Sequence, residues 1–288
     1  MERLIVDNAA ACQAPLPAFA DDPRPIGVFD SGIGGLTVAA ALRRRLPAET
    51  LLYLGDLARL PYGTKEARTV TRYALNAAAF FVSRGVKMMV LACNTASAHA
   101  VEVVRRHHPG LAVLGVIDAG AERAAAQSPG GRIVVAATEG TCRSGAFQRA
   151  IAGRRPPATV TAVPCPMFVA LVEEGLTEGP IAEAMARQYL LHHFRGEHAA
   201  DCLVLGCTHF PLLAPTLRKV VGPAPLVVDC AEAVAEQAAR TLAATAAAAS
   251  GDGAIHLFAT DAADRFAAVA GRFFPALGER PAVEVVDL

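Results

Sequence analysis

From residue 25 to near its end, the sequence alternates short apolar runs, rich in β-branched residues, with longer segments of helical length. Short, continuously apolar strands are typical of a sheet that helices cover on both faces. The alternation indicates parallel pairing with right-handed crossovers. The pattern therefore predicts an α/β fold, with strands at 26–29, 51–54, 88–91, 112–116, 133–136, 159–163, 202–205, 226–228, 255–259 and 283–286. Helices are expected at 36–46, 65–84, 98–108, 181–194 and 231–248.

Two of these strands end in similar sequences. MMVLACNTASA at 88–98 and CLVLGCTHFPL at 202–212 each run from an apolar strand through a small residue and a cysteine into a polar cluster. A weaker similarity joins VFDSGIGG at 28–35 with VAATEGT at 135–141. The similarities predict two related α/β halves, although chance similarity is the alternative, because a strand, a small turn and a helix often follow one another in this fold class.

Composition excludes several classes of protein. A chain of 288 residues exceeds the usual size of one hydrophobic core, so two domains are expected. Hydrophobic residues make up 53%, which excludes disorder, and the balance of 27 basic against 27 acidic residues argues against a nucleic-acid partner. No apolar run approaches the roughly 18–20 residues of a membrane span. Seven cysteines without a CxxC spacing favour a reducing, cytoplasmic location over a disulfide scaffold or a zinc site.

Ligands of an open parallel sheet bind beyond the carboxyl ends of its strands, so the turns there are candidate binding loops. The turn after 26–29 reads Asp30-Ser31-Gly32-Ile33-Gly34-Gly35, which lacks the G-x-G-x-x-G spacing of a dinucleotide site. Its backbone amides suit a carboxylate-bearing small molecule, although a tight turn without a ligand also explains it. The segment Pro61-Tyr62-Gly63 reads as a plain turn or as a loop that holds amides and a phenol over a pocket.

The two cysteine turns predict reactive groups. Cys93 and Cys207 each follow a strand and precede an expected helix N-terminus, where the dipole and free amides lower a thiol pKa from about 8.5 toward neutrality. His209 lies two residues after Cys207, close enough to act as a base or a polarising partner. The other cysteines are expected to be inert small hydrophobes; they are Cys12, Cys142, Cys165, Cys202 and Cys230.

Two thiols in equivalent positions of facing halves would approach one ligand from opposite sides. A thiolate on one side can remove a proton while a thiol on the other side donates one, which inverts a carbon stereocentre without a cofactor. A Cys–His hydrolase would need only Cys207 and His209. A metal site built from Cys93, Cys207 and His209 lacks a second closely spaced ligand pair, so no metal is expected.

Six segments resemble the glutamate racemases, a cofactor-independent family that interconverts L- and D-glutamate for bacterial peptidoglycan synthesis. They are VFDSGIGGLTV (28–38), LPYGTK (60–65), ACNTASA (92–98), ATEGT (137–141), LGCTHFPLL (205–213) and the weaker FATD (258–261). The resemblance covers residues 25 to 270 in the family's order.

The resemblance implies roles for particular residues. The family's two base cysteines fall on Cys93 and Cys207, its acidic first-motif residue on Asp30, and its assisting histidine on His209. A further assisting acid falls on Glu173, with Glu174 as the alternative. The implied substrate-binding positions are Asp30, Ser31, Pro61, Tyr62, Gly63, Asn94, Thr95, Thr138, Thr141, Thr208 and His209.

The resemblance also implies partners and an organisation in two similar parallel-sheet α/β domains, related by pseudo-two-fold symmetry, with the active site between them. The first domain would comprise 25–117 and 229–288, and the second 118–228. Residues 1–24 lie outside the resemblance, and their own sequence predicts a loosely ordered extension. Glutamate is the implied small-molecule substrate. A homodimer and regulation by a cell-wall precursor, which occurs in family members with such an extension, are further hypotheses. The alternatives are an aspartate or hydantoin racemase, a Cys–His hydrolase, and a module that binds an amino acid without turnover.

Overall fold

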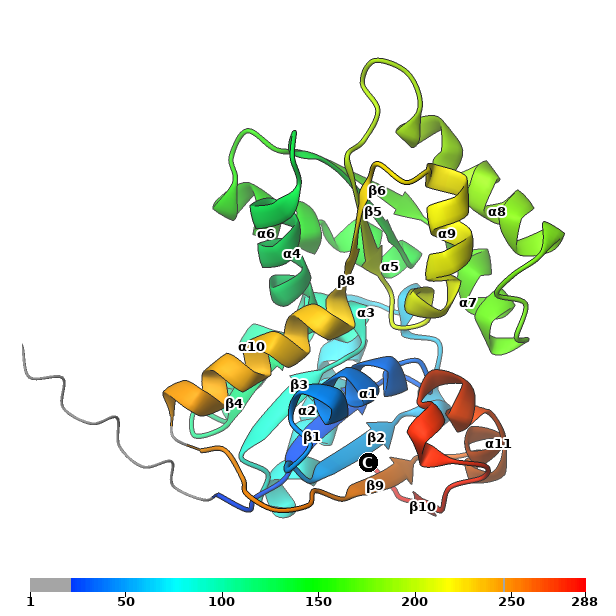
Figure 1. The fold of residues 1–288 in the computed structure, drawn as a ribbon. Helices are drawn as coiled ribbons and strands as arrows, with labels where there is room; N and C mark the ends of the chain where they lie inside the picture. Colours follow the sequence, from blue (N-terminus) through cyan, green and yellow to red (C-terminus); the bar gives the residue numbers. More distant parts are fainter. Residues whose placement is uncertain (1–21, 246) are drawn as a thin grey trace, which may run out of the picture.

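Two parallel β-sheets, one in each half of the molecule, form the framework of the fold (Figure 1). The computed structural model describes residues 22–245 and 247–288. Residues 1–21 of the expected extension, Cys12 among them, therefore lie outside the described residues. All ten expected strands are present within the described part of the chain.

The first sheet has the strand order β10-β9-β2-β1-β3-β4, and every neighbouring pair is parallel. Its strands are β1 (Ile26–Asp30), β2 (Leu51–Gly55), β3 (Met88–Leu91), β4 (Ala112–Gly115), β9 (Ile255–Ala259) and β10 (Val283–Val285). Both faces are buried, because β1, β2 and β3 have no exposed residue. This agrees with the uninterrupted apolar runs that predicted these strands.

The second sheet has the order β6-β5-β7-β8 and is also parallel throughout. Its strands are β5 (Arg132–Ala137), β6 (Thr159–Pro164), β7 (Cys202–Gly206) and β8 (Leu226–Asp229). The order β2-β1-β3-β4 within the first sheet is the same as β6-β5-β7-β8 in the second. The prediction of two similar halves is thus confirmed, and β3 and β7 occupy equivalent places.

Helices surround both sheets. They are α1 (Leu36–Arg45), α2 (Ala67–Ser83), α3 (Asn94–His107), α4 (Val116–Gln127), α5 (Glu139–Ser144), α6 (Ala146–Arg154), α7 (Pro166–Glu173), α8 (Pro180–Leu190), α9 (Ala214–Val221), α10 (Cys230–Ala244) and α11 (Ala263–Phe273). Short 3₁₀ turns are η1 (Leu57–Arg59), η2 (Tyr62–Thr64), η3 (Leu191–Phe194), η4 (Phe210–Leu213) and η5 (Pro275–Leu277). Among the described residues, no helix is both long enough and apolar enough to cross a membrane.

Two helix starts differ from expectation. Helix α3 begins at Asn94, four residues before the predicted start, because the extended backbone of Cys93 serves as its N-cap. The segment after Cys207 does not enter a helix directly. The amide of Phe210 donates to the carbonyl of Cys207, which closes a turn that continues into η4. Helix α9 starts only at Ala214, with a proline in its first turn, where the missing N–H costs nothing.

Helix α10 connects the two halves (Figure 1). It starts where β8 of the second sheet ends, and the Asp229 side chain caps it by accepting a hydrogen bond from the amide of Ala231 at 2.8 Å. Its small residues pack against α1 of the first half and α4 of the second. Arg44 of α1 forms an ion pair with Glu232 of α10. The helix is therefore a shared wall of both halves.

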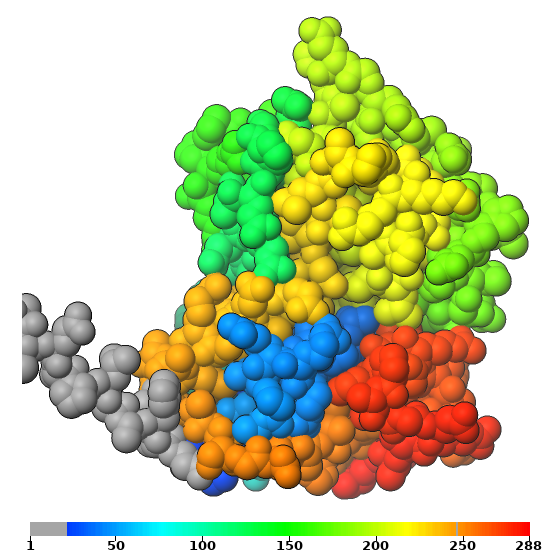
Figure 2. Space-filling model, viewed as in Figure 1, coloured from blue at the N-terminus to red at the C-terminus, as the bar shows by residue number. Residues whose placement is uncertain are grey.

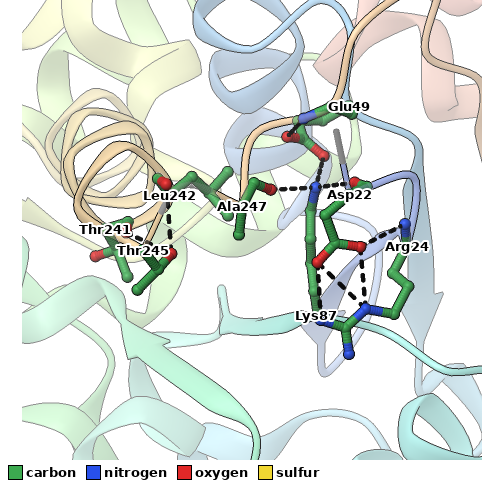
Figure 3. Close-up of polar contacts among 9 residues, drawn as sticks. Asp22, Arg24, Glu49, Lys87, Thr241, Leu242, Thr245 and Ala247 are labelled. Carbon is green, nitrogen blue, oxygen red and sulfur yellow. Dashed lines mark hydrogen bonds and ion pairs between the residues drawn. The ribbon is translucent and has the colours of Figure 1, made fainter. Parts of the chain in front are cut away.

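A buried ion pair closes the first sheet at the end away from the cysteines (Figure 3). The ammonium of Lys87 lies 2.7 Å from a carboxylate oxygen of Glu49, and both side chains are 2% exposed. Lys87 also donates to the backbone carbonyls of Asp22 at 2.6 Å and Ala247 at 2.7 Å. The second oxygen of Glu49 accepts from the amide of Ala249 at 2.8 Å. One lysine thus fixes three chain segments that are distant in sequence.

Candidate active site

Strand ends from both sheets meet where the halves face each other. Asp30 is the last residue of β1, Cys93 follows β3, and Cys207 follows β7. Both thiols are buried, at 6% and 7% exposure. Asn94, the residue after Cys93, lines the same small cavity as Cys207, and the charge of Cys207 adds to the raised pKa of Cys93. The similarity of the two strand ends therefore corresponds to two thiols at one interface.

Cys93 lies in a closely packed environment within the first half. Its sulfur is 3.4 Å from the hydroxyl oxygen of Ser31. The helix position predicted a lowered pKa, and this prediction is wrong. Burial and the nearby charge of Asp30 raise the pKa of the Cys93 thiol to about 12, outweighing its hydrogen bonds with the Ser31 hydroxyl and the Ala96 amide. Cys93 is thus a neutral thiol at ordinary pH, ready to donate a proton.

Cys207 has a chain of titratable partners instead. Its sulfur lies 3.8 Å from Nδ1 of His209, and Nε2 of the same ring lies 3.3 Å from Oε1 of Glu173. Burial disfavours the imidazolium, but hydrogen bonds with Cys207 and Glu173 and the charge of Asp30 outweigh it and raise the pKa of His209 to about 10. The hydrogen bond with His209 lowers the pKa of Glu173 despite partial burial. Of the two candidate acids, Glu173 contacts His209, whereas Glu174 is exposed.

Asp30 supplies a buried carboxylate beside this thiol pair. Its Oδ2 accepts a hydrogen bond from the amide of Gly32 at 3.0 Å. Burial raises the pKa of Asp30, partly offset by the charge of His209 and by backbone amides of its own loop. Within the described residues, Oδ1 of Asp30 and Oδ1 of the buried Asn94 have no hydrogen-bond partner. Because a buried unpaired acceptor costs about 1–3 kcal/mol, both oxygens favour a ligand that donates hydrogen bonds.

Three hydroxyl groups gather on the neighbouring loops. The Oγ1 atoms of Thr95, Thr138 and Thr141 lie 3.1–3.2 Å from one another. Thr95 belongs to the first half and the other two to the second, so the cluster crosses the interface. Hydroxyls in this arrangement can turn their protons toward a carboxylate.

The glycine loop of the first half touches the Cys207 turn directly. A side chain carbon on Gly34 would lie 2.5 Å from both Nδ1 of His209 and Oγ1 of Thr208, so only glycine fits there. Three residues after Gly34, the hydroxyl of Thr37 donates to the carbonyls of Gly34 and Thr208, each at 3.0 Å. These contacts bring Thr208 and His209 against the first loop.

The loop at 60–65 closes another side of the interface. Gly63 packs on Thr138, where an added carbon would lie 3.0 Å from the threonine Cβ, while Pro61 is exposed. Tyr62 is buried, and its hydroxyl donates to Asp56 at 2.6 Å. Tyr62 shares a core cluster with Cys93, so its ring lies in the same part of the first half although its hydroxyl is engaged by Asp56.

Sequence reasoning missed two groups of supporting residues. Asp56, fully buried, also accepts from Arg59 and from Thr260 of the FATD segment, each at 2.8 Å, and so anchors Tyr62. Its place at the end of β2 was the available signal. The second group lies on α11, where Phe273 meets the ring of His209 edge-on at 5.5 Å. No local pattern in the sequence pointed to α11.

The residues of the site are almost inaccessible to solvent, since Asp30, Cys93 and Cys207 are 1%, 6% and 7% exposed. A cavity of about 10 Å³ touches Asn94, Cys207 and Thr208, but its other walls include Asp229 and Cys230, and Cys93 does not line it. With the site buried in this way, an amino acid enters when the halves or their loops move apart. Among the described residues, no group of three or more His, Cys, Asp or Glu is arranged to hold a metal ion.

Comparison with known proteins agrees with this geometry. The model of the Asp/Glu/Hydantoin racemase family matches residues 35–238. Glutamate racemase of Geobacter metallireducens is 47% identical over 219 residues, covering 76% of this chain and 80% of that protein. Glutamate racemase of Francisella tularensis in complex with D-glutamate is 33% identical, has a TM-score of 0.84, and the match covers 92% of this chain and 98% of that one. Escherichia coli glutamate racemase in complex with L-glutamate and the activator UDP-MurNAc-ala is 28% identical, with a TM-score of 0.76 and coverage of 92% and 100%. The chain belongs to the Asp/Glu/Hydantoin racemase family.

Proposed function

We propose that this chain interconverts L- and D-glutamate, with Cys93 and Cys207 as its two acid–base groups. Membership of the family makes the chain an amino-acid racemase, which is an isomerase. The observation that carries the proposal is the equivalent position of two buried thiols, one at the end of β3 and one at the end of β7, at a single interface. Glutamate as the substrate is supported by the relatives, which are named glutamate racemases.

Each turnover exchanges one proton for another. In one direction the thiolate of Cys207, paired with the imidazolium of His209, takes the α-proton, so that a C–H bond breaks and an S–H bond forms. The neutral thiol of Cys93 then gives its proton to the opposite face of the carbanion. This turnover leaves Cys207 as a thiol and Cys93 as a thiolate, and the reverse direction begins from that state. Both proton transfers are thus assigned to the two thiols, and nothing is oxidised or reduced.

Polar groups around the thiols would hold the substrate. The unpaired oxygens of Asp30 and Asn94 are suited to accept hydrogen bonds from the ammonium group. The hydroxyls of Thr95, Thr138 and Thr141 are suited to donate to a carboxylate. Ser31, Gly63, Thr208 and His209 complete the proposed wall, together with Pro61 and Tyr62 of the loop at 60–65. Removing one donor of this kind in a water-excluded site commonly lowers the rate by about 10²–10³.

The wider biological role is also part of the proposal. Glutamate racemisation would supply D-glutamate for peptidoglycan precursors in the cytoplasm, without a cofactor. The two domains would be 25–117 with 229–288, and 118–228, in accord with the distribution of strands between the sheets. The Escherichia coli relative binds the activator UDP-MurNAc-ala, which supports a cell-wall precursor as a candidate regulator here. Self-association as a homodimer is the proposed assembly, to be checked by light scattering.

Proton exchange in heavy water tests the proposal. Purified protein should convert either enantiomer of glutamate and place deuterium at Cα of the product, observed by proton NMR together with a chiral assay. Cys93→Ser and Cys207→Ser should each lower racemisation by about 10²–10⁴. Cys142→Ala, a half-buried cysteine outside the thiol pair, is the matched control and should retain activity.

Three results would contradict the proposal and identify the alternatives. Faster turnover of aspartate or a hydantoin would identify a different racemase of the family. A trapped thioester on Cys207, with Cys93 dispensable, would identify a Cys–His hydrolase. Tight glutamate binding without incorporation of deuterium would identify a binding module.

A further inference from the structure

Helix α11 contacts the Cys207 side of the site from the opposite half of the molecule. It follows β9 of the first sheet and lies below α7 of the second half in Figure 1. The space-filling view shows the C-terminal segment in contact with that half (Figure 2). Helix α11 also lies outside the residues 35–238 that the family model matches. The contacts that α11 makes with the site are therefore features outside the matched region.

Arg272 caps the end of α7. Its Nη1 donates to the backbone carbonyl of Glu173 at 3.0 Å. Helix α7 ends there in a turn in which the amide of Leu176 donates to the carbonyl of Leu171 and Gly175 adopts φ +76°. A cation at a helix C-terminus satisfies free carbonyls and complements the helix dipole. Arg272 thus fixes the backbone that carries the Glu173 side chain.

Arg265 and Phe273 reach the side chains themselves. Nη2 of Arg265 lies 3.7 Å from Oε2 of Glu173, while Oε1 of the same carboxylate faces His209. Arg265 is one of the charges that lower the pKa of Glu173, after His209 itself. The buried ring of Phe273 stands edge-on to the imidazole, with an interplanar angle of 87°. Glu173 and His209 are therefore each held by a residue of α11.

We propose that α11 is a latch in which Arg265, Arg272 and Phe273 position Glu173 and His209 against Cys207 when the two halves are closed. This inference rests on the proposed function and adds that α11 serves one thiol and not the other. Cys93 takes its contacts from Ser31 and Asp30, both in the first half, so it keeps them whether α11 is engaged or not. Opening the site to exchange substrate separates α11 from α7 and relaxes only the Cys207 side.

The first test measures kcat/KM for both enantiomers in Arg265→Met, Arg272→Met and Phe273→Leu. Because a misplacement of about 1 Å can cost about 100-fold in rate, losses of about 10- to 100-fold are expected. Arg272→Lys, which keeps a cationic donor, should recover most of the loss. Asp264→Asn changes an exposed charge next to Arg265 on the same helix and serves as the matched control, with activity close to wild type. Thermal unfolding of each variant identifies any that fail to fold. Phe273→Leu keeps an apolar side chain at this buried position, so that it tests the ring contact with His209 in a folded protein.

The second test separates positioning of Cys207 from a general loss of structure. With α-deuterated substrates, a variant that slows only the Cys207 step makes that step limiting in both directions. The substrate isotope effect on kcat/KM should then rise for the enantiomer whose proton Cys207 removes and fall for the other. A merely structural defect changes both isotope effects alike.

The pH profile gives a further readout. Arg265→Met removes a charge that lowers the pKa of Glu173, so the acidic limb of kcat/KM should move to higher pH, whereas Arg265→Lys should keep it. If the isotope effects for the two enantiomers change alike and the acidic limb of kcat/KM in Arg265→Met stays at its wild-type pH, the latch proposal is wrong. The wild-type protein is the reference throughout, because absence of racemisation in wild type would instead contradict the proposed function.

Discussion

Cys207 lies 3.8 Å from the imidazole of His209, whereas Cys93, its counterpart in the other half, lies 3.4 Å from the hydroxyl of Ser31. The backbone of the two halves repeats one topology, but the groups around the two thiols do not repeat. Burial and Asp30 keep Cys93 neutral, while His209 provides a positive partner for Cys207. The two proton transfers of a racemase thus start from chemically different groups.

The first prediction concerns the alkaline limb of activity. The pKa of His209 is raised to about 10, so the imidazolium beside Cys207 persists below that pH and is lost as pH rises through it. Racemisation should therefore decline near pH 10. His209→Asn should lower kcat/KM by about 10²-fold or more and abolish this limb. Initial rates by circular dichroism between pH 6 and 11 make the comparison.

The same residue links stability to pH. A pKa that is raised on folding stabilises the folded state fully below the unfolded value of 6.5, and this contribution disappears as pH climbs toward 10. Urea midpoints of the wild-type protein should fall across that interval, and those of His209→Asn should fall less. Parallel curves for the two proteins would contradict the protonated state assigned to His209.

The second prediction concerns Asp30. Its charge contributes to the raised pKa of Cys93, so Asp30→Asn should lower that pKa and speed alkylation of Cys93 by iodoacetamide at a fixed pH. Racemisation should fall by about 10²-fold, because the variant loses the carboxylate assigned to the substrate ammonium. Mass spectrometry of the labelled peptide, with Cys93→Ser as the unlabelled reference, measures the rate. Slower alkylation of the asparagine variant would show that the charge of Asp30 does not act on this thiol.

The strand ends of this fold could be predicted from the sequence because apolar runs stop at the first polar residue. That rule placed Asp30, Cys93 and Cys207 at strand ends, and the structure has them there. The likeness between the cysteine turns also anticipated the repeated strand order. Each of these inferences depends only on residues that are neighbours in the sequence, so no knowledge of the packing of the halves was needed.

Other features depend on burial and on the way the halves pack. Position at a helix start predicted a lowered pKa for Cys93, but the cost of burying a thiolate outweighs the helix amides. The contact of Arg272 with Glu173 joins residues 99 positions apart, and no periodicity reports such a pairing. The role of Asp56 emerges only when Tyr62 and Thr260 are seen to share it.

The third prediction tests closure of the site through Gly34. In Gly34→Ala the new carbon would lie 2.5 Å from His209 and Thr208, so the glycine loop and the Cys207 turn must separate. A loss of about 100-fold in kcat/KM is expected from such a displacement. Gly32→Ala is the matched variant, since its nearest neighbour is Leu60 at 3.7 Å, and its loss should be much smaller. Equal losses in the two variants would argue against a tight contact at Gly34.

The last prediction concerns stability at the end of the first sheet away from the site. Glu49→Ala leaves the buried ammonium of Lys87 without its carboxylate, so unfolding in urea should become easier by about 3–5 kcal/mol. Glu49→Leu combined with Lys87→Met removes both charges and should recover part of that loss. The control is Glu232→Ala, which breaks an exposed pair with Arg44 and should cost about 0–1 kcal/mol. Lys87 and Cys93 lie beyond opposite ends of β3, so the substitutions at Lys87 and Glu49 are remote from the thiols. Variants that fold should therefore keep kcat/KM near wild type. Equal losses of stability for Glu49→Ala and Glu232→Ala would mean that the Lys87 ion pair contributes no more than a surface contact.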